Sequence, residues 1–285
     1  MSRAIFLLLL TASLAAAADI PPVRIVAANL TSGNHQTYSP DNGNHSNIEG
    51  AGARILKALA PDIVLIQEFN TTIPVRQWVN ATFGESFMFV QEPGGGIPNG
   101  IISRFPILES GEWDDVKLDN RDFVWAKIAL PDGSKLWAVS VHLYAQNPAT
   151  RTDQARALVN LLKSRVRPGD RIVVGGDLNT RNLAEQCLAE FSRLVAVPDD
   201  LPADQFGNQN TNAPRNKPYD WILVDPVTNA SCRPVRLGTQ SFANGFIFDS
   251  RLFEPSSLPP PVQSADSAVP GMQHMAVIRD FSISK

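Results

Sequence analysis

The sequence predicts an α/β fold in which two packed β-sheets are flanked by helices. Apolar runs of strand length alternate with helical patterns along the whole chain, and no linker divides it. Several of these runs are apolar at every position, so both faces of their sheet must be covered. Strand-rich connections between the helices favour two sheets over a single one.

The first half of the chain is predicted to alternate strands and helices. The capping box Ser46–Glu49 begins a helix whose apolar stripe stops at Pro61. A second helix has Pro74 in its first turn and closes at Gly84. The predicted strands of the whole chain lie at residues 24–29, 63–68, 100–107, 123–130, 136–142, 172–176, 220–224 and 276–281.

In the second half the strongest helix is expected over residues 150–166. A Thr150-x-x-Asp153 box precedes an apolar face, and Gly169 lies just past its end. A turn at Pro131–Gly133 joins two of the strands, and a shorter helix is expected over 183–193. A Pro- and Ser-rich stretch at 254–271 is interpreted as a surface loop and not as a domain boundary.

The composition is that of an ordinary globular protein. The chain has 285 residues, of which 44% are hydrophobic and 19% charged, enough for one large domain or two small ones. The net charge of −3 provides no overall basic field for nucleic acid. A local basic groove or a bound cation could still hold phosphate groups.

Residues 1–18 have the features of a signal peptide. Arg3 precedes a short apolar run, Ile5–Leu14, and Ala16–Ala18 forms a small-residue cleavage site. The run is too short to span a bilayer comfortably, and no cysteine follows it that could carry a lipid anchor. We therefore expect a secreted or periplasmic protein whose single mature domain covers residues 19–285. The two cysteines, Cys187 and Cys232, could pair in an oxidising compartment or remain free.

Two apolar runs end in oxygen-bearing side chains, and they carry most of the functional information. Residues 63–68 end in Gln67-Glu68, and residues 172–179 end in Asp177-Leu-Asn179. Strands that end in this way deliver hard oxygen ligands to one edge of a sheet. Pro218–Val224, which contains Asp220, and a terminal Gln273-His274 follow in order.

The order and chemistry of these motifs resemble the endonuclease/exonuclease/phosphatase superfamily, the metal-dependent phosphodiesterases related to pancreatic deoxyribonuclease. The resemblance covers essentially the whole mature chain. It implies a four-layer α/β sandwich of two mixed sheets, with the active site where strand ends of both sheets converge. It also implies a Mg²⁺ or Mn²⁺ cofactor, which prefers carboxylate and water oxygens.

The resemblance assigns a role to each candidate residue. Glu68 would be the principal metal ligand, and Asn29 a direct or indirect contact of metal and phosphate. His142 resembles the general acid, and His274 the general base or a phosphate-stabilising group, held in its tautomer by Asp220. In isolation each of these residues has a structural explanation as a strand end, a turn former or a core histidine.

Asp177-Leu-Asn179 is the sharpest of the motifs. In an extended segment, residues two apart point the same way, so the carboxylate and the amide could address one phosphate. Asp177 would orient water or bind metal, and Asn179 would stabilise charge developing at phosphorus. Gly175 and Gly176 are expected where a substrate backbone approaches closely. The alternative is an Asp-x-Asn turn that caps the next helix.

Five further positions carry weaker signals. Asn99 and Arg104 match a stretch near the substrate groove, although the Phe-Pro-Ile that follows Arg104 is equally a packing motif. Trp221 is expected in the core. Gln273 departs from the pattern, because the family usually has Asp before this histidine; Gln supplies an oxygen ligand but no charge. Asp266, just upstream, is a candidate replacement.

These expectations combine into a secreted, Mg²⁺- or Mn²⁺-dependent phosphodiesterase in which water attacks phosphorus in line. The leading substrate is DNA, and phospholipids or inositol phosphates are the alternative, since the same fold serves both. A second class of hypothesis is a non-catalytic phosphate-binding module with a decayed site. No hydrophobic hairpin for stable membrane insertion and no obligate protein partner is evident.

Overall fold

The computed structural model describes residues 21–32, 36–39, 50–94, 96–115 and 117–283. The expected signal peptide and the capping box Ser46–Glu49 lie outside these residues. The helix expected after the capping box is present within them, beginning at Ala51 with Gly50 as its N-cap.

The first sheet contains the strands that begin and end the described chain. Its order is β10-β14-β1-β2-β4-β3, with β13 also paired to β14. β1 and β2 are parallel and all other pairs are antiparallel, so the sheet is mixed. The bounds are β1 Val23–Ala28, β2 Ile63–Ile66, β3 Met88–Gln91, β4 Gly100–Ser103, β10 Cys232–Arg233, β13 Phe246–Phe248 and β14 Ala276–Phe281.

The second sheet is formed by the middle of the chain, in the simple order β5-β6-β7-β8-β9. β7 and β8 are parallel, so this sheet is mixed as well. The bounds are β5 Ile107–Trp113, β6 Phe123–Ala129, β7 Lys135–His142, β8 Arg171–Asp177 and β9 Asp220–Val224. A separate hairpin pairs β11 Val235–Leu237 with β12 Gln240–Phe242.

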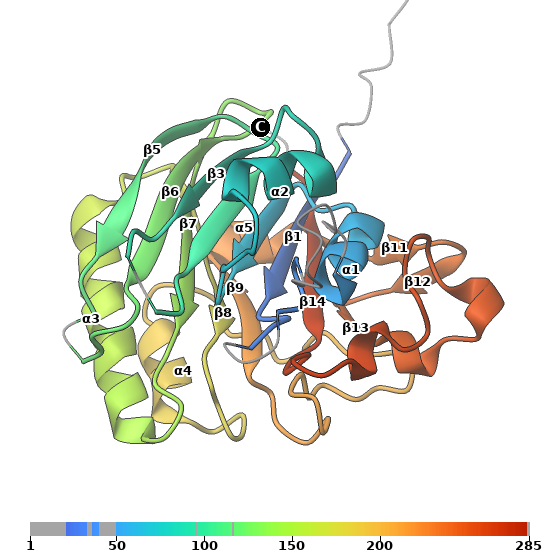
Figure 1. The fold of residues 1–285 in the computed structure, drawn as a ribbon. Coiled ribbons are helices and arrows are strands. Elements are labelled where there is room, and N and C mark those ends of the chain that lie inside the picture. The colour runs from blue at the N-terminus through green and yellow to red at the C-terminus, as the bar shows by residue number, and fades with distance from the viewer. Residues whose placement is uncertain (1–20, 33–35, 40–49, 95, 116, 284–285) are drawn as a thin grey trace, which may run out of the picture.

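Helices cover the outer faces of both sheets, as Figure 1 shows, and this confirms the predicted four-layer sandwich. α1 (Ala51–Leu59) and α2 (Val75–Phe83) pack on the first sheet, and α3 (Pro148–Arg165) and α4 (Gln186–Phe191) on the second. A short α5 (Pro226–Ala230) precedes β10. Among the described residues, no helix combines the length and the apolar character needed to cross a membrane.

Side-chain alternation explains how the second sheet serves two cores. In β7, Leu136 and Ala138 face the first sheet, whereas Trp137 and Val139 face α3 and α4. β8 and β9 repeat the pattern, because successive side chains of a strand point to opposite faces. Both faces are therefore apolar, as the sequence predicted. Trp221 is buried on the outer face, as expected, and its indole N–H donates to the carbonyl oxygen of Pro218.

Three predicted boundaries were wrong. The helix expected over 183–193 covers only Gln186–Phe191. The run 100–107 is two strands, because the chain turns after Ser103, whose hydroxyl accepts from the amide of Phe105 at 3.0 Å. The helix predicted from Thr150 begins at Pro148, and its N-cap is Asn147, whose side chain accepts from the amide of Ala149. Proline suits the first helical position because its missing N–H would lack a partner there anyway.

The cysteines are both free thiols and do not pair. Cys187 lies in the core between α4 and the second sheet, where burial raises its pKa to about 12. Cys232 lies in β10 at the edge of the other sheet. The loop at 254–271 has only short 3₁₀ turns, at Pro255–Ser257 and Asp266–Ala268, in agreement with its interpretation as a loop.

Candidate active site

Three of the predicted site residues lie on one rung of the second sheet. His142 in β7 is in register with Asp177 in β8, and Asp177 is in register with Asp220 in β9. By the alternation of these strands, all three side chains face the first sheet. Each is buried, so the rung lies between the two sheets at one end of the sandwich.

The first sheet brings Asn29 and Glu68 to the same place. Ala28 and Ile66 are in register in the parallel strands β1 and β2, and Asn29 and Glu68 follow them within two residues. The amide nitrogen of Asn29 donates to Asp177 Oδ2 at 3.0 Å and lies 3.5 Å from Glu68 Oε1. One amide therefore joins the two strand ends that the sequence singled out.

His274 completes the cluster from the segment just before β14. Its Nδ1 lies 2.9 Å from Asp220 Oδ2 and 3.0 Å from Oδ1, while its Nε2 lies 3.8 Å from Asp177 Oδ2. His142 Nε2 approaches the same Asp177 oxygen at 3.2 Å. Asp177 is thus the common centre of Asn29, His142 and His274.

The two histidines are driven toward opposite charge states. Burial alone would lower the pKa of His274, but the carboxylates of Asp220 and Asp177 outweigh it and raise that pKa to about 9. Burial, together with Arg121 and His274, holds the pKa of His142 well below its usual range. At neutral pH an imidazolium therefore stands beside a neutral imidazole.

These charge states bear on the predicted roles. A positively charged His274 fits the phosphate-stabilising role better than that of a general base. The neutral ring of His142 satisfies its contact with Asp177 when Nε2 carries the proton. Its Nδ1 is buried and has no hydrogen-bond partner among the described residues. Burial also raises the pKa of Asp177 to about 7, against the opposing effects of His274 and of hydrogen bonds from Asn179 and Asn29.

The Asp177-Leu-Asn179 motif does not adopt the extended geometry that the sequence suggested. Asn179 has φ +53°, and its amide N–H donates to Asp177 Oδ1 at 2.8 Å, which closes an Asx turn. The side-chain amide of Asn179 donates to the carbonyl oxygen of Leu143 at 3.0 Å. The turn, not strand alternation, joins the backbone of Asn179 to Asp177, and the buried side chain bonds to the residue that follows β7.

The prediction for Gly175 and Gly176 was wrong. A Cβ at Gly175 would lie 2.6 Å from the carbonyl oxygen of Trp221 and 2.8 Å from the Leu65 side chain. A Cβ at Gly176, where φ is +126°, would clash with the Gln67 amide. These glycines make room for the neighbouring strand and for the opposite sheet, not for a substrate.

Arg104, Gln273 and Asp266 do not reach the cluster. Arg104 follows the far end of β4, because Ser103 is in register with Ile63, and it pairs with Asp62 at 2.8 Å. Gln273 has an exposed side chain, since it precedes the buried His274 and consecutive extended residues face opposite ways. Asp266 is buried in an ion pair with Arg54.

Asn99 is at the correct end of the sheet, just before the β4 residue that pairs with Ile66. Its amide nitrogen donates to the carbonyl oxygen of Asp122. Its side-chain oxygen is buried without a hydrogen-bond partner among the described residues.

Sequence reasoning missed three residues that support the cluster. Arg121 is buried and donates to the carbonyl oxygens of His142 and Leu143 at 2.6 and 3.1 Å. The Oγ1 of Thr211 donates to Asp220 Oδ2 at 2.6 Å. Tyr219 packs its ring against His274, with 5.3 Å between centroids. Only Tyr219 had a signal, its position beside Asp220; the other two are polar residues of irregular loops.

The comparisons with known proteins agree with this arrangement. The model of the Endonuclease/Exonuclease/phosphatase family matches residues 46–241. The chain belongs to this family. Members of the family are hydrolases that act on phosphoester bonds. Among curated protein sequences, none matches the chain closely enough to count as a relative.

Solved structures show the same fold at low sequence identity. An endonuclease/exonuclease/phosphatase from Bacteroides vulgatus has a TM-score of 0.60 and 16% identity, over 92% of this chain and 99% of that one. Beta toxin from Staphylococcus aureus has a TM-score of 0.54 and 14% identity, over 92% and 100%. TDP2 from Caenorhabditis elegans has a TM-score of 0.54 and 15% identity, over 92% and 74%.

The family is generally dependent on divalent metal, and the residues present fit such a cation. Glu68 and Asp177 supply carboxylate oxygens, and the Oδ1 of Asn29 is buried without a hydrogen-bond partner among the described residues. Hard oxygens of this kind suit Mg²⁺ or Mn²⁺. Asp177, Asp220 and His274 also hold ligand atoms within 4.8 Å of one another. Asp177 belongs to both groups of ligands, so it would contact the metal whichever group binds it.

Proposed function

We propose that this protein is a secreted or periplasmic, Mg²⁺- or Mn²⁺-dependent phosphodiesterase that uses water as nucleophile, with DNA as the leading substrate. The observation that carries the proposal is the convergence of Asn29, Glu68, His142, Asp177 and His274 from both sheets on one buried point. A phosphate held there would meet carboxylates, amides and an imidazolium together, as phosphoryl transfer requires.

Each residue has a task that its position supports. The cation, when bound, would polarise the phosphoryl oxygen and screen the carboxylates from the anionic substrate. Asp177 accepts hydrogen bonds and lies centrally, so it is placed to orient water. His274, held by Asp220, offers a positive charge to the phosphate. His142 donates a hydrogen bond to Asp177 from its neutral ring; the general-acid role that the resemblance implies needs the protonated ring, which its lowered pKa disfavours.

An open hollow whose wall includes Pro218, two residues before Asp220, supports a substrate larger than a phosphate group. It has a volume of about 400 Å³, and Pro218 at its wall is next to Tyr219. Arg181 lines it and places its guanidinium 5.6 Å from the Tyr219 ring centroid. Leu183 and amide side chains, including Gln209, also line it. The cationic and amide side chains of this lining suit the phosphate and base of a nucleotide next to the scissile phosphate.

The phospholipid or inositol phosphate alternative rests on the fold, which serves several substrates. The non-catalytic alternative rested on Gln273, but that side chain points away from the cluster, so the glutamine is no sign of decay. The presence of Glu68, Asp177 and Asp220 together with both histidines in the cluster favours a hydrolytic site over a decayed one.

A substrate panel tests the proposal. Plasmid DNA, sphingomyelin and bis-p-nitrophenyl phosphate are each incubated with the mature protein, in EDTA and in EDTA with excess Mg²⁺ or Mn²⁺. We expect DNA and bis-p-nitrophenyl phosphate to be cleaved only with metal. Equal turnover in EDTA would refute metal dependence. Cleavage of sphingomyelin alone would refute DNA as the substrate and favour a phospholipid. The N-terminal sequence of exported material, expected near Asp19, tests the localisation.

A further inference from the structure

An irregular segment, Asp204–Lys217, contacts Asp220 and the residues on either side of His274. It contains no helix and no strand longer than a single bridge, and it ends three residues before β9. Its Thr211 is 1% exposed and makes two hydrogen bonds with Asp220. The Thr211 hydroxyl donates to Asp220 Oδ2 and accepts from the Asp220 amide, so it fixes both the carboxylate and the backbone of that residue.

The same segment also holds the chain on both sides of His274. The amide of Ala213 donates to the carbonyl oxygen of Gln273, and the amide of Met275 donates to that of Thr211, each at 2.7 Å. A bridge pairs Asn212 with His274 itself. The position of the imidazole relative to Asp220 therefore depends on the shape of this segment.

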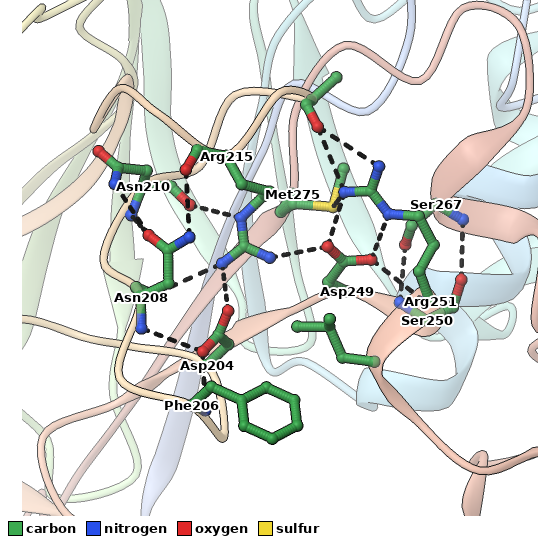
Figure 2. A network of polar contacts seen from close by, with 12 residues as sticks. Asp204, Phe206, Asn208, Asn210, Arg215, Asp249, Ser250, Arg251, Ser267 and Met275 are labelled. Atoms are coloured by element: carbon green, nitrogen blue, oxygen red, sulfur yellow. Dashed lines mark hydrogen bonds and ion pairs between the residues drawn. The ribbon is translucent and has the colours of Figure 1, made fainter.

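One arginine fixes that shape. The guanidinium of Arg215 contacts Asp249 through Nη1 and Asp204 through Nη2, each at 2.7 Å, and its Nε donates to the carbonyl oxygen of Asn210 at 2.7 Å (Figure 2). The two carboxylate side chains are 1% and 3% exposed. The guanidinium of arginine holds its donors in a rigid planar fork, so it can reach three acceptors on different sides, a geometry that the compact ammonium of lysine does not reproduce.

The backbone conformation of Arg215 also indicates that this residue determines the shape of the segment. Its φ is +57°, in the left-handed region that favours glycine over other residues. A residue other than glycine in this backbone conformation is strained, which indicates that the surrounding contacts hold Arg215 there. The carbonyl oxygen of Arg215 accepts from Asn208 Nδ2 at 3.1 Å, so the strained residue is also held from the other side (Figure 2).

We propose that Arg215 is a positioning residue for the Asp220–His274 pair. It folds the Asp204–Lys217 segment around its guanidinium, and the segment in turn sets Asp220 through Thr211 and sets His274 through the backbone of its neighbours. The effect on catalysis rests on the proposed phosphodiesterase function, whereas the effect on the segment does not.

The first experiment measures bis-p-nitrophenyl phosphate hydrolysis by the full mature chain at saturating metal. Arg215→Met keeps the apolar stem but removes the three donors. We expect kcat to fall by about a hundredfold, the scale of a misplacement near 1 Å, with KM changed by less than about twofold. Arg215→Lys, which retains charge but not the fork, should fall between the wild type and Arg215→Met.

Arg24→Met is the matched control. Arg24 also forms a doubly hydrogen-bonded, largely buried pair, with Asp280, but at the end of β1 away from Asn29. It should lower the melting temperature and leave kcat unchanged. If Arg215→Met also lowers only the melting temperature, the ion pairs of Arg215 with Asp204 and Asp249 are merely structural and the proposal is overturned.

A second pair of variants tests the route through Thr211. Thr211→Val removes the hydroxyl at nearly constant volume and should lower kcat, whereas Thr211→Ser should restore it. In the double variant with Arg215→Met the losses should not add, because both act on Asp220. Full additivity would contradict the route. If Arg215→Met does not fold, Thr211→Val and Arg215→Lys still decide the question.

Hydrogen exchange provides a measurement that needs no activity. Arg215→Met should speed amide exchange in peptides covering 208–222 and 272–277, and Arg24→Met should not. Unchanged exchange in both peptides would overturn the proposal even if kcat fell. If the wild type cleaves nothing in the panel, the proposed function fails, but this measurement still judges the positioning by Arg215.

Discussion

At the scale of single residues, Asp177 is the point on which the site depends. It accepts the Asn29 amide and lies within 4 Å of a nitrogen of each of two histidines that carry different charges. These donors offset part of the cost of burying the carboxylate, but burial still raises its pKa to about 7. Asn29 and Glu68, from the other sheet, complete the group of oxygens. The proposed metal binding therefore depends on few side chains, each of which one substitution can test.

Glu68→Gln should raise the Mg²⁺ concentration needed for half-maximal activity by about ten- to a hundredfold, because a carboxylate ligand becomes a neutral amide. Gln273→Asp and Asp266→Asn are the controls. Gln273 has an exposed side chain and Asp266 is paired with Arg54, so neither should alter the Mg²⁺ titration. Asp266→Asn should lower the melting temperature instead. An unchanged titration for Glu68→Gln would remove Glu68 from the ligand set.

At the scale of elements, the close approach of two sheets is what brings the strand ends together. Gly175 permits this approach where β8 meets Leu65 of β2, and the Gln67 amide nitrogen donates to the Ser140 hydroxyl at 2.8 Å just beyond. The Ser140 hydroxyl in turn donates to the carbonyl oxygen of Ile66. These contacts fix the distance between the rung of His142 and Asp177 and the end of β2.

Gly175→Ala should lower the free energy of unfolding by about 1–3 kcal/mol, the usual cost of overpacking a close-packed core. The added methyl would lie 2.6 Å from a backbone oxygen that cannot move freely. Gly96→Ala is the control, because the nearest atom to its new Cβ is 4.0 Å away, in Asn120. Urea denaturation of both variants measures the difference. Equal stability of the two would show that the sheets can separate without cost.

At the scale of the whole molecule, a buried carboxylate joins loops of the two sheets. Glu92 follows β3 and accepts from the amides of Asn99 and Asp122, each at 2.9 Å. Asn99 precedes β4 of the first sheet, and Asp122 precedes β6 of the second. Burial raises the pKa of Glu92 to about 7, against the effect of these hydrogen bonds.

This shift makes stability depend on pH in a defined direction. The folded protein binds the proton of Glu92 more tightly than the unfolded chain does, where the carboxyl titrates near 4.5. Its contribution to the free energy of unfolding is therefore full below about 4.5 and is lost as pH rises to about 7. The stability of the wild type relative to Glu92→Gln should decrease across this interval and level off above it. A constant difference in urea unfolding from pH 4.5 to 7 would contradict the shift.

The sequence by itself determined the fold class, most of the strands and the identity of the clustered residues. These are local signals: apolar runs that need cover on both faces, and carboxylates at strand ends, which a sheet must deliver to one edge. Four of the clustered residues lie at or beside strand ends, where the family resemblance assigns them without any knowledge of the loops. These are His142, Asp177, Asp220 and His274.

Only the tertiary structure decided how the loops serve the site. Arg104 and Gln273 were misjudged because proximity in sequence does not show which end of a strand, or which side of the chain, a residue occupies. Arg121, Thr211 and Arg215 were missed because their partners lie on irregular segments whose shape no periodicity encodes. Gly175 and Gly176 were assigned to a substrate because a sequence shows that space is needed but not what fills it. The long-range packing of the two sheets determines the contacts of all these residues, and local sequence patterns carry no information about that packing.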